Sequence, residues 1–140
     1  LSMRYSQDLL GEDFARLVFI EQLTGSNEEH IVAAHPESHG DVILGRKDTP
    51  ASYHIAVVHD DALQRVTHVI RGEDLRASTH VHALLQKLLG LPTPAYRHHR
   101  LVTGPDGKRY AKRDRSLTLA SLRADGVTPA EIRARIGLSC

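Results

Sequence analysis

The chain has 140 residues, of which 41% are hydrophobic and 25% charged, a composition typical of one soluble globular domain that can bury its own core. Its single cysteine, Cys140, excludes a disulfide framework and a cysteine-built zinc site among these residues, and we expect a reducing, cytoplasmic setting. The longest apolar runs, such as residues 55–58, are far shorter than the ~20 residues that span a bilayer, so we expect no membrane partner.

The formal net charge of +1 conceals an uneven distribution along the chain. Residues 1–94 hold 8 Lys and Arg against 13 Asp and Glu, whereas residues 95–140 hold 10 against 4. A basic C-terminal part favours an anionic partner such as a nucleotide or RNA, although a solvated charged surface is the commoner explanation. Charge alone therefore leaves the partner undecided.

The first part of the chain mixes helical and strand-like patterns. Residues 4–23 predict a short helix followed by a strand. Residues 25–40 are polar and predict a loop or a small peripheral subdomain. Two β-rich runs follow at residues 41–46 and 52–59, and the short polar segment between them completes a predicted β-hairpin.

The middle of the chain predicts a strand followed by a helix. Residues 66–70 are β-branched and apolar enough to form a strand. An amphipathic helix follows, with Ser78 or Thr79 as its N-cap and Gly90 after its end. Its apolar positions recur every three or four residues, at Val81, Leu84, Leu85, Leu88 and Leu89.

Residues 96–102 predict a further strand, and residues 103–107 have the composition of a turn. Two short helices are expected after it, one around residues 117–124 and one that begins after Thr128 and ends before Gly137. Strand, helix and strand in succession predict a right-handed βαβ unit with parallel strands. The predicted fold class is therefore α/β.

Arg71 directly follows the strand at residues 66–70, and open parallel sheets bind ligands beyond the carboxyl ends of their strands. The planar guanidinium of arginine can hold a carboxylate through two hydrogen bonds. The alternative is an internal ion pair with Glu73, Asp74 or the aspartates at 60–61. Position alone leaves both interpretations open.

Ten histidines and an adjacent pair of aspartates raise the question of a metal site. The aspartates at 60–61 lie where the predicted hairpin ends, so a turn or cap role is favoured over metal binding or acid–base chemistry. His80 and His82 diverge around a helix, and His98 and His99 point to opposite sides of a strand. Because three ligands would have to converge from such positions, no metal site is predicted in this chain.

A strongly basic segment follows the predicted turn. Residues 108–115 contain five Lys or Arg, as a loop that closes over phosphates requires. A solvated basic loop is the alternative that composition leaves open.

Four regions, in the same order, carry a resemblance to a known family: GDVILGRKD (40–48) with YHIAVVHDD (53–61), VTHVIRGEDL (66–75), LLGLPTPAY (88–96) and DGKRYAKRD (106–114). Across residues 41–138 the chain resembles the glutamyl-Q tRNA(Asp) synthetases, paralogues of glutamyl-tRNA synthetase. The resemblance implies the C-terminal half of a class I synthetase Rossmann-like nucleotide-binding domain, with a β-hairpin and short C-terminal helices. Residues 1–40 would be the tail of an inserted subdomain, and residues 41–140 the second half of the catalytic domain.

The resemblance also implies roles for individual residues. Tyr53 matches a tyrosine that contacts glutamate, and Arg71 matches the arginine that binds a carboxylate of glutamate. Residues 109–113 occupy an ATP-binding signature loop that is usually KLSKR, and Lys112 matches its catalytic, ATP-contacting lysine. The loop departs from that signature at its first three positions but stays basic at both ends; its residues are Arg109, Tyr110, Ala111, Lys112 and Arg113.

The implied reaction is ATP-dependent activation of glutamate and its transfer to tRNA, with Mg²⁺-ATP as substrate and queuosine of tRNA(Asp) as acceptor. The alternatives are glutamyl-tRNA synthetase, which charges the acceptor end of tRNA, and a non-catalytic module that binds nucleotide or RNA. Family members also carry a half with a His-x-Gly-His signature and a cysteine-rich zinc site, neither of which occurs in this sequence. We therefore expect an inactive fragment whose partners are glutamate, ATP, tRNA and a missing N-terminal half, with zinc only in that half.

Overall fold

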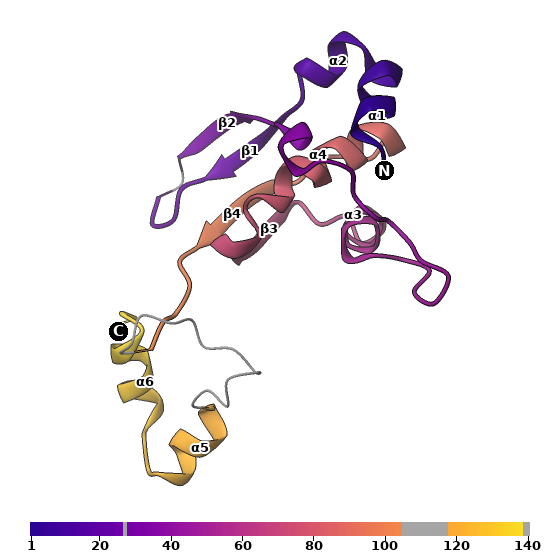
Figure 1. The fold of residues 1–140 in the computed structure, drawn as a ribbon. Helices are drawn as coiled ribbons and strands as arrows, with labels where there is room; N and C mark the ends of the chain where they lie inside the picture. Colours follow the sequence, from indigo (N-terminus) through magenta and orange to yellow (C-terminus); the bar gives the residue numbers. More distant parts are fainter. Residues whose placement is uncertain (27, 105–117, 139–140) are drawn as a thin grey trace. The chain divides into compact units, whose positions relative to one another are not determined.

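The computed structural model describes residues 1–26, 28–104 and 118–138, which divide into two compact units, Leu1–Arg100 and Leu101–Cys140. The first unit combines helices with a sheet, which confirms the α/β class (Figure 1). Among the described helices, none has the length and apolar character that crossing a membrane requires.

The sheet of the first unit has four strands: β1 (Val18–Gln22), β2 (Glu29–Ala33), β3 (His68–Gly72) and β4 (Ala95–His99). Their order is β2-β1-β4-β3, with β1 antiparallel to β2 and parallel to β4, and β3 parallel to β4. Helices α1 (Met3–Leu10) and α2 (Glu12–Ala15) precede β1, so the predicted order of helix and strand at the start of the chain is confirmed. Parallel β3 and β4 bring their carboxyl ends to the same edge of the sheet, where Arg71 lies.

The predicted βαβ unit is present, because α4 (Ser78–Leu89) connects β3 to the parallel strand β4. Gly90 ends α4 in the left-handed conformation at φ 65°, as the sequence predicts. The predicted N-cap is wrong: Ser78 and Thr79 are both inside the helix, and the capping position is Ala77, without a side-chain bond. The 3₁₀ helix η2 (Glu73–Leu75) leads into α4 with helical backbone, so the N–H groups of Thr79 and His80 in its first turn have carbonyl partners.

The predicted loop or small subdomain at residues 25–40 contains a strand instead. Strand β2 pairs along its whole length with β1, and the 3₁₀ helix η1 (Pro36–His39) follows it. The adjacent β-branched residues Ile31 and Val32 favour this edge strand, although the residues on either side are polar.

The predicted β-hairpin is wrong. Residues 41–46 have no regular secondary structure, and residues 53–63 form helix α3 (Tyr53–Leu63). Val58 explains the difference, because it is buried against Val81 and Leu85 of α4. This packing outweighs the strand preference of the β-branched residues, and it places the aspartates at 60–61 within a helix rather than at the end of a strand.

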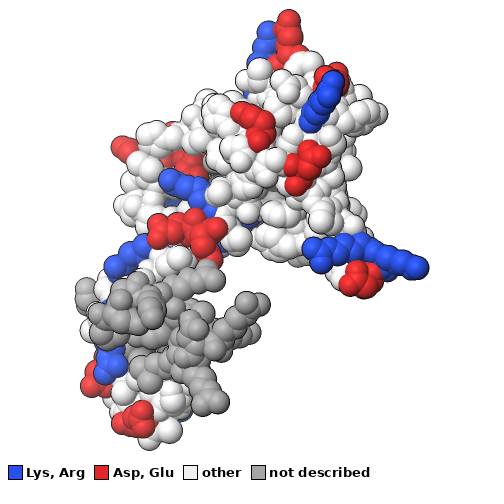
Figure 2. All heavy atoms as spheres, in the orientation of Figure 1, with Lys and Arg blue, Asp and Glu red and all other residues white. Residues whose placement is uncertain are grey.

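The main core lies between the sheet and the helices α1, α2 and α4. Its buried apolar residues are Met3, Phe14, Leu17, Phe19, Ala34, Ala83, Leu84 and Tyr96. Acidic and basic side chains are interspersed on the face of this unit that Figure 2 shows. The basic cluster at residues 108–115 lies outside the described residues.

The second unit contains the two short helices that the sequence predicts, α5 (Leu119–Ala124) and α6 (Pro129–Arg135). Each begins with a capping box, in which the N-cap threonine and the third helical residue satisfy each other's backbone N–H. The N-caps are Thr118 and Thr128, and Gly137 adopts a positive φ just after α6.

Candidate functional site

Arg71 is the central residue of the candidate site. It is the fourth residue of β3, at the carboxyl end of the strand, and it is only 9% exposed. Its Nε donates to His98 Nε2 at 3.2 Å, and its Nη2 donates to Thr79 Oγ1 at 2.7 Å. Its Nη1 donates to His82 Nδ1 at 3.2 Å and to the Tyr53 hydroxyl at 3.5 Å. A buried cation is thus surrounded by uncharged hydrogen-bond acceptors.

The aromatic ring of Tyr96 covers one side of this cation. The guanidinium carbon of Arg71 lies 5.1 Å from the ring centroid, within the range of a cation–π interaction. The hydroxyl of Tyr96 accepts a hydrogen bond from Gln86 Nε2 at 2.9 Å, which holds the ring in place. Burial raises the pKa of Tyr96, so the ring stays uncharged next to the arginine.

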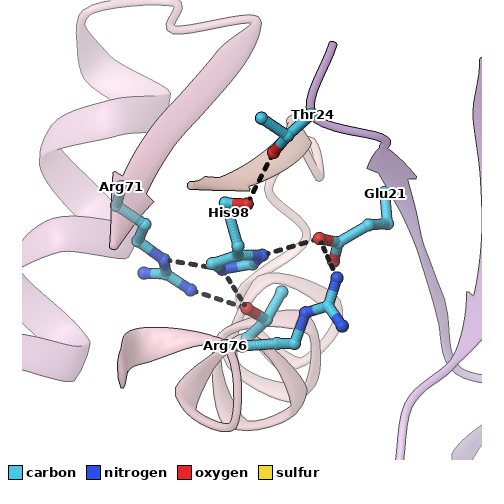
Figure 3. A network of polar contacts seen from close by, with 6 residues as sticks. Glu21, Thr24, Arg71, Arg76 and His98 are labelled. Atoms are coloured by element: carbon cyan, nitrogen blue, oxygen red, sulfur yellow. Dashed lines mark hydrogen bonds and ion pairs between the residues drawn. The ribbon is translucent and has the colours of Figure 1, made fainter. Parts of the chain in front are cut away.

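A chain of polar contacts continues from Arg71 across the sheet (Figure 3). His98 Nδ1 lies 2.9 Å from Glu21 Oε1, and Arg76 Nη2 donates to the same oxygen at 2.7 Å. Thr24 Oγ1 donates to the carbonyl of His98 at 2.9 Å. These contacts join strands β1, β3 and β4 and the segment before α4 into one network.

The pKa shifts in this network follow from burial and hydrogen bonding. Burial raises the pKa of Glu21, but hydrogen bonds from His98 and Arg76 outweigh it, so the pKa of Glu21 is below its ordinary value. Burial lowers the pKa of His98, and the opposing bond to Glu21 does not cancel that effect. The network therefore combines an ionised Glu21 with a neutral His98.

A second histidine pair approaches Arg71 from the helices. His82, on α4, is 1% exposed, and its Nε2 lies 3.1 Å from Nδ1 of His54 on α3. Burial, followed by the charge of Arg71, lowers the pKa of His82 to about 3. Because the Nδ1 of this neutral imidazole accepts from Arg71, its Nε2 carries the proton and donates to His54.

Two sides of the guanidinium differ in burial. We call the buried side the inner wall, formed by Glu21, Thr79, His82 and His98, and the α3 side the outer wall, formed by Tyr53 and His54. Tyr53 is 49% exposed, whereas the inner-wall side chains are all buried. A ligand carboxylate can therefore approach Arg71 from the outer wall. The guanidinium of Arg71 is positively charged, its hydrogen-bond partners are neutral, and its N–H groups can donate to the carboxylate.

The structure brings together two of the residues singled out in the sequence, Tyr53 and Arg71. The hydrogen bonds of Arg71 seen in the described ranges are to neutral side chains rather than to the acidic residues that sequence position left open. Asp61 is influenced by the charge of Arg71, which opposes the rise in the Asp61 pKa caused by burial. The loop at residues 109–113, including Lys112, lies outside the described residues.

No group of three or more metal-ligating side chains occurs in the described part of the chain. As predicted, His98 and His99 point to opposite sides of β4, because His98 is buried while His99 is exposed. The interaction of His98 with Arg71 and Glu21 uses both of its ring nitrogens, so His98 acts in a hydrogen-bond network.

Sequence reasoning missed the inner wall, although the pattern contained a signal. Glu21 is two residues after the core residue Phe19, so its charged side chain lies on the same, buried face of β1. Likewise, the buried side of α4 carries three polar residues spaced three and four positions apart: Thr79, His82 and Gln86. Polar residues at core positions indicate a buried network, because each needs a hydrogen-bond partner.

Comparison with known proteins assigns this chain to a family. The family model for the catalytic domain of class I tRNA synthetases (E and Q) matches residues 25–139, and the chain belongs to that family. It is 56% identical over 99 residues to a glutamyl-Q tRNA(Asp) synthetase of Rhodobacter capsulatus, covering 71% of this chain and 36% of the relative. A relative of the same name from Symbiobacterium thermophilum is 48% identical over 97 residues, covering 69% of this chain and 30% of that protein.

Solved structures agree with the family assignment. A glutamate tRNA ligase from Elizabethkingia meningosepticum, crystallised in complex with its amino acid, matches 81% of this chain and 24% of its own, with a TM-score of 0.55 at 28% identity. The structural similarity supports the Rossmann-like α/β assignment. The chain spans about a third of the length of the curated relatives it matches.

Proposed function

We propose that this chain supplies a carboxylate-binding site for glutamate and part of the ATP site of a glutamate-activating synthetase. In the first step a glutamate carboxylate oxygen attacks the α-phosphorus of Mg²⁺-ATP, which releases pyrophosphate and leaves glutamyl-adenylate. In the second step an RNA hydroxyl attacks the activated carbonyl and releases AMP. Positioning and charge stabilisation suffice for such chemistry, so no residue of this chain has to act as a general base.

The observation that carries this proposal is the buried guanidinium of Arg71 with its neutral partners. A buried positive charge is costly unless an anion accompanies it, so this site is suited to a ligand that brings a carboxylate. Tyr53 lies at the accessible side of the same guanidinium and supplies a hydroxyl beside the incoming ligand. Both residues lie at positions for which the family resemblance implies contacts with glutamate.

The ATP part of the proposal rests on the basic loop at residues 109–113. Lys112 would interact with the phosphates of ATP and stabilise the charge that develops as pyrophosphate leaves. Arg109 and Arg113 keep positive charge at the two ends of the loop, while Tyr110 and Ala111 depart from the usual signature. The role of this loop is supported by its composition and by the family match.

The proposed acceptor is queuosine of tRNA(Asp). The name and the 56% identity of the Rhodobacter capsulatus relative favour this acceptor over the acceptor end of tRNA, which the 28% identical glutamate tRNA ligase would suggest. A direct test compares tRNA(Asp) with and without queuosine and tRNA(Glu) as acceptors of labelled glutamate. Labelling of tRNA(Glu) alone would favour transfer to the acceptor end of tRNA, the reaction of a glutamyl-tRNA synthetase. If none of the RNAs is labelled, both proposed acceptors are opposed.

The activity test uses a chimera in which residues 25–139 replace the matching segment of the Rhodobacter capsulatus relative. Glutamate-dependent exchange of labelled pyrophosphate into ATP measures adenylate formation. We expect exchange by the chimera but none by the 140-residue chain alone, which spans only 36% of that relative. A chimera that folds, as judged by circular dichroism, but gives no exchange with any amino acid would contradict the proposal.

Substitution of the signature lysine tests the ATP part separately. In the chimera, Lys112→Ala should lower the maximal rate of adenylate formation by about a hundredfold, because it removes a preorganised charge from the transition state. Lys47→Ala, at an exposed position, is the matched control and should leave the rate unchanged. An unchanged rate in Lys112→Ala would remove this residue from the catalytic assignment.

A further inference from the structure

Three strands contribute one row of polar side chains on the face of the sheet that is covered by α4. Arg71 of β3 and His98 of β4 are direct partners in the strand register. Tyr96, two residues before His98, is the partner of Glu21 on β1, so all four side chains share one face. The contacts along this row run from Arg71 to His98 and from His98 to Glu21.

The hydrogen-bond directions in this row determine where the imidazole proton lies. The Nε of Arg71 always carries its hydrogen and can only donate, so Nε2 of His98 must offer a lone pair. The Nδ1 of His98 then carries the proton and donates to the carboxylate of Glu21. The opposite tautomer would direct two N–H groups at each other across 3.2 Å and would remove the hydrogen bond that His98 donates to Glu21.

Glu21 is itself held in place by Arg76, which donates to the same carboxylate oxygen. Glu21 thus selects one tautomer of His98, and that tautomer supplies the acceptor for Arg71. Thr79 receives the Nη2 hydrogen on the same side, so two edges of the guanidinium are restrained by buried groups.

We infer that His98, with its tautomer set by Glu21, is a positioning residue that holds the plane of the Arg71 guanidinium for a ligand carboxylate. This inference rests on the proposed function, because it names the residues that prepare the same site. A two-point contact between guanidinium and carboxylate requires both groups to be coplanar, and a guanidinium free to rotate loses part of its binding energy on being ordered. His98 does not contact the ligand in this scheme; it acts through Arg71.

The first experiment measures the tautomer without any ligand. Two-bond proton–nitrogen NMR spectra of the 140-residue chain at pH 7 should show His98 protonated at Nδ1 alone, together with a slowly exchanging Arg71 Nε–H signal. In Glu21→Ala the tautomers of His98 should become mixed, and the exchange of the Arg71 signal should become faster. A wild-type His98 that is protonated at Nε2, alone or with Nδ1, would overturn the inference.

The second experiment measures glutamate affinity by NMR titration of the same chain. His98→Phe keeps a ring beside Tyr96 but removes the acceptor, and we expect a loss of about tenfold in affinity, the cost of leaving a buried donor unpaired. His98→Gln, whose side-chain oxygen can replace Nε2, should stay within about threefold of wild type. His99→Phe is the matched control at the exposed neighbouring position and should bind like wild type.

The outcomes separate this inference from the proposed function. If Arg71→Ala weakens glutamate binding but His98→Phe does not, the positioning role is overturned and the function remains. If Arg71→Ala binds glutamate as tightly as wild type, or if wild type does not bind glutamate, the proposed carboxylate site is overturned. This holds even if the NMR spectra show His98 protonated at Nδ1 as expected. Equal losses in His98→Phe and His98→Gln would also oppose the positioning role, since the acceptor would then be irrelevant.

Discussion

The inner and outer walls contact the same guanidinium in different ways. Thr79 and His98 of the inner wall are buried, and their contacts with Arg71 are 2.7 and 3.2 Å long. Tyr53 of the outer wall is half exposed, and its contact with Arg71 is longer, at 3.5 Å. A buried partner cannot be replaced by water, whereas an exposed one can. The inner wall therefore sets the orientation of Arg71, and the outer wall is where a ligand can replace a protein contact.

The two walls also differ in how the chain builds them. The inner wall joins segments that are far apart in sequence, because β1, α4 and β4 each contribute a side chain to it. The outer wall comes from the first turn of α3 alone, with Tyr53 and His54 adjacent in sequence. Changes to the inner wall should consequently affect both stability and binding, whereas changes to the outer wall should affect binding with little effect on stability.

The largest effect is expected at Arg71, where the two walls meet. Arg71→Ala should lower the affinity for glutamate by roughly ten- to a hundredfold, because a charge-assisted two-point contact is worth about 1.5–3 kcal/mol. Arg71→Lys should recover only part of the loss, since an ammonium has no planar fork. Isothermal titration of the chimera with glutamate and with ATP measures both affinities.

The control for Arg71 is Arg65→Ala, which removes an exposed arginine between α3 and β3 that the chimera contains. It should change neither affinity measurably, because surface substitutions away from a site usually change free energies by no more than about 0.5 kcal/mol. If Arg71→Ala lowers the affinity for ATP as much as the affinity for glutamate, Arg71 has a structural role. The proposal that a ligand carboxylate reaches Arg71 from the outer wall would then be contradicted.

Local patterns predict the part of the fold that carries Arg71. The apolar spacing of α4, the stop at Gly90 and the β-branched run before Arg71 each depend on residues close together in sequence, so the βαβ unit and the position of Arg71 follow from them. The two C-terminal helices are predictable for the same reason, because Thr128 and Gly137 mark the limits of the second one.

Long-range packing explains what the sequence could not predict. The β-branched residues near Val58 favour a strand locally, but burial of Val58 against α4 makes the segment helical. The inner wall depends on the sheet order, which places β1 next to β4 and so brings Glu21 to His98, 77 residues away. The pairing of distant strands is not encoded in any local pattern, so these contacts required the structure.

His82 of the inner wall should make the stability of the chain depend on pH. Its pKa is about 3 in the folded chain and near 6.5 when the chain unfolds, so unfolding takes up a proton between these values. The free energy of unfolding is therefore largest above pH 6.5 and falls as pH decreases. From pH 7 to pH 5, His82 alone should account for a loss of about 2 kcal/mol.

Urea unfolding of wild type and His82→Asn at pH 7, 6 and 5 tests this expectation. The variant keeps a side-chain acceptor near the Nδ1 position but cannot titrate, so its stability should fall less steeply with decreasing pH. The pKa values of His54, His80 and His98 are also lowered, mainly by burial, so a slope of the same sign should remain. The exposed control His30→Asn should retain the wild-type slope, and an equal slope in His82→Asn would show that His82 is not buried in neutral form.

The smallest effect is expected at Tyr53 of the outer wall. Its hydroxyl is 3.5 Å from Arg71 Nη1, and the side chain is half exposed, so water can take the place of the hydroxyl in Tyr53→Phe. We expect the free energy of unfolding to change by no more than about 0.5 kcal/mol, and the affinity for glutamate to fall only about two- to threefold. Urea unfolding and NMR titration of the 140-residue chain measure the two quantities, with Tyr5→Phe at an exposed position of α1 as the matched control. A loss of stability as large as that caused by an inner-wall substitution would show that Tyr53 supports the fold. The two walls would then not differ in their effect on stability, which would contradict the distinction drawn between them.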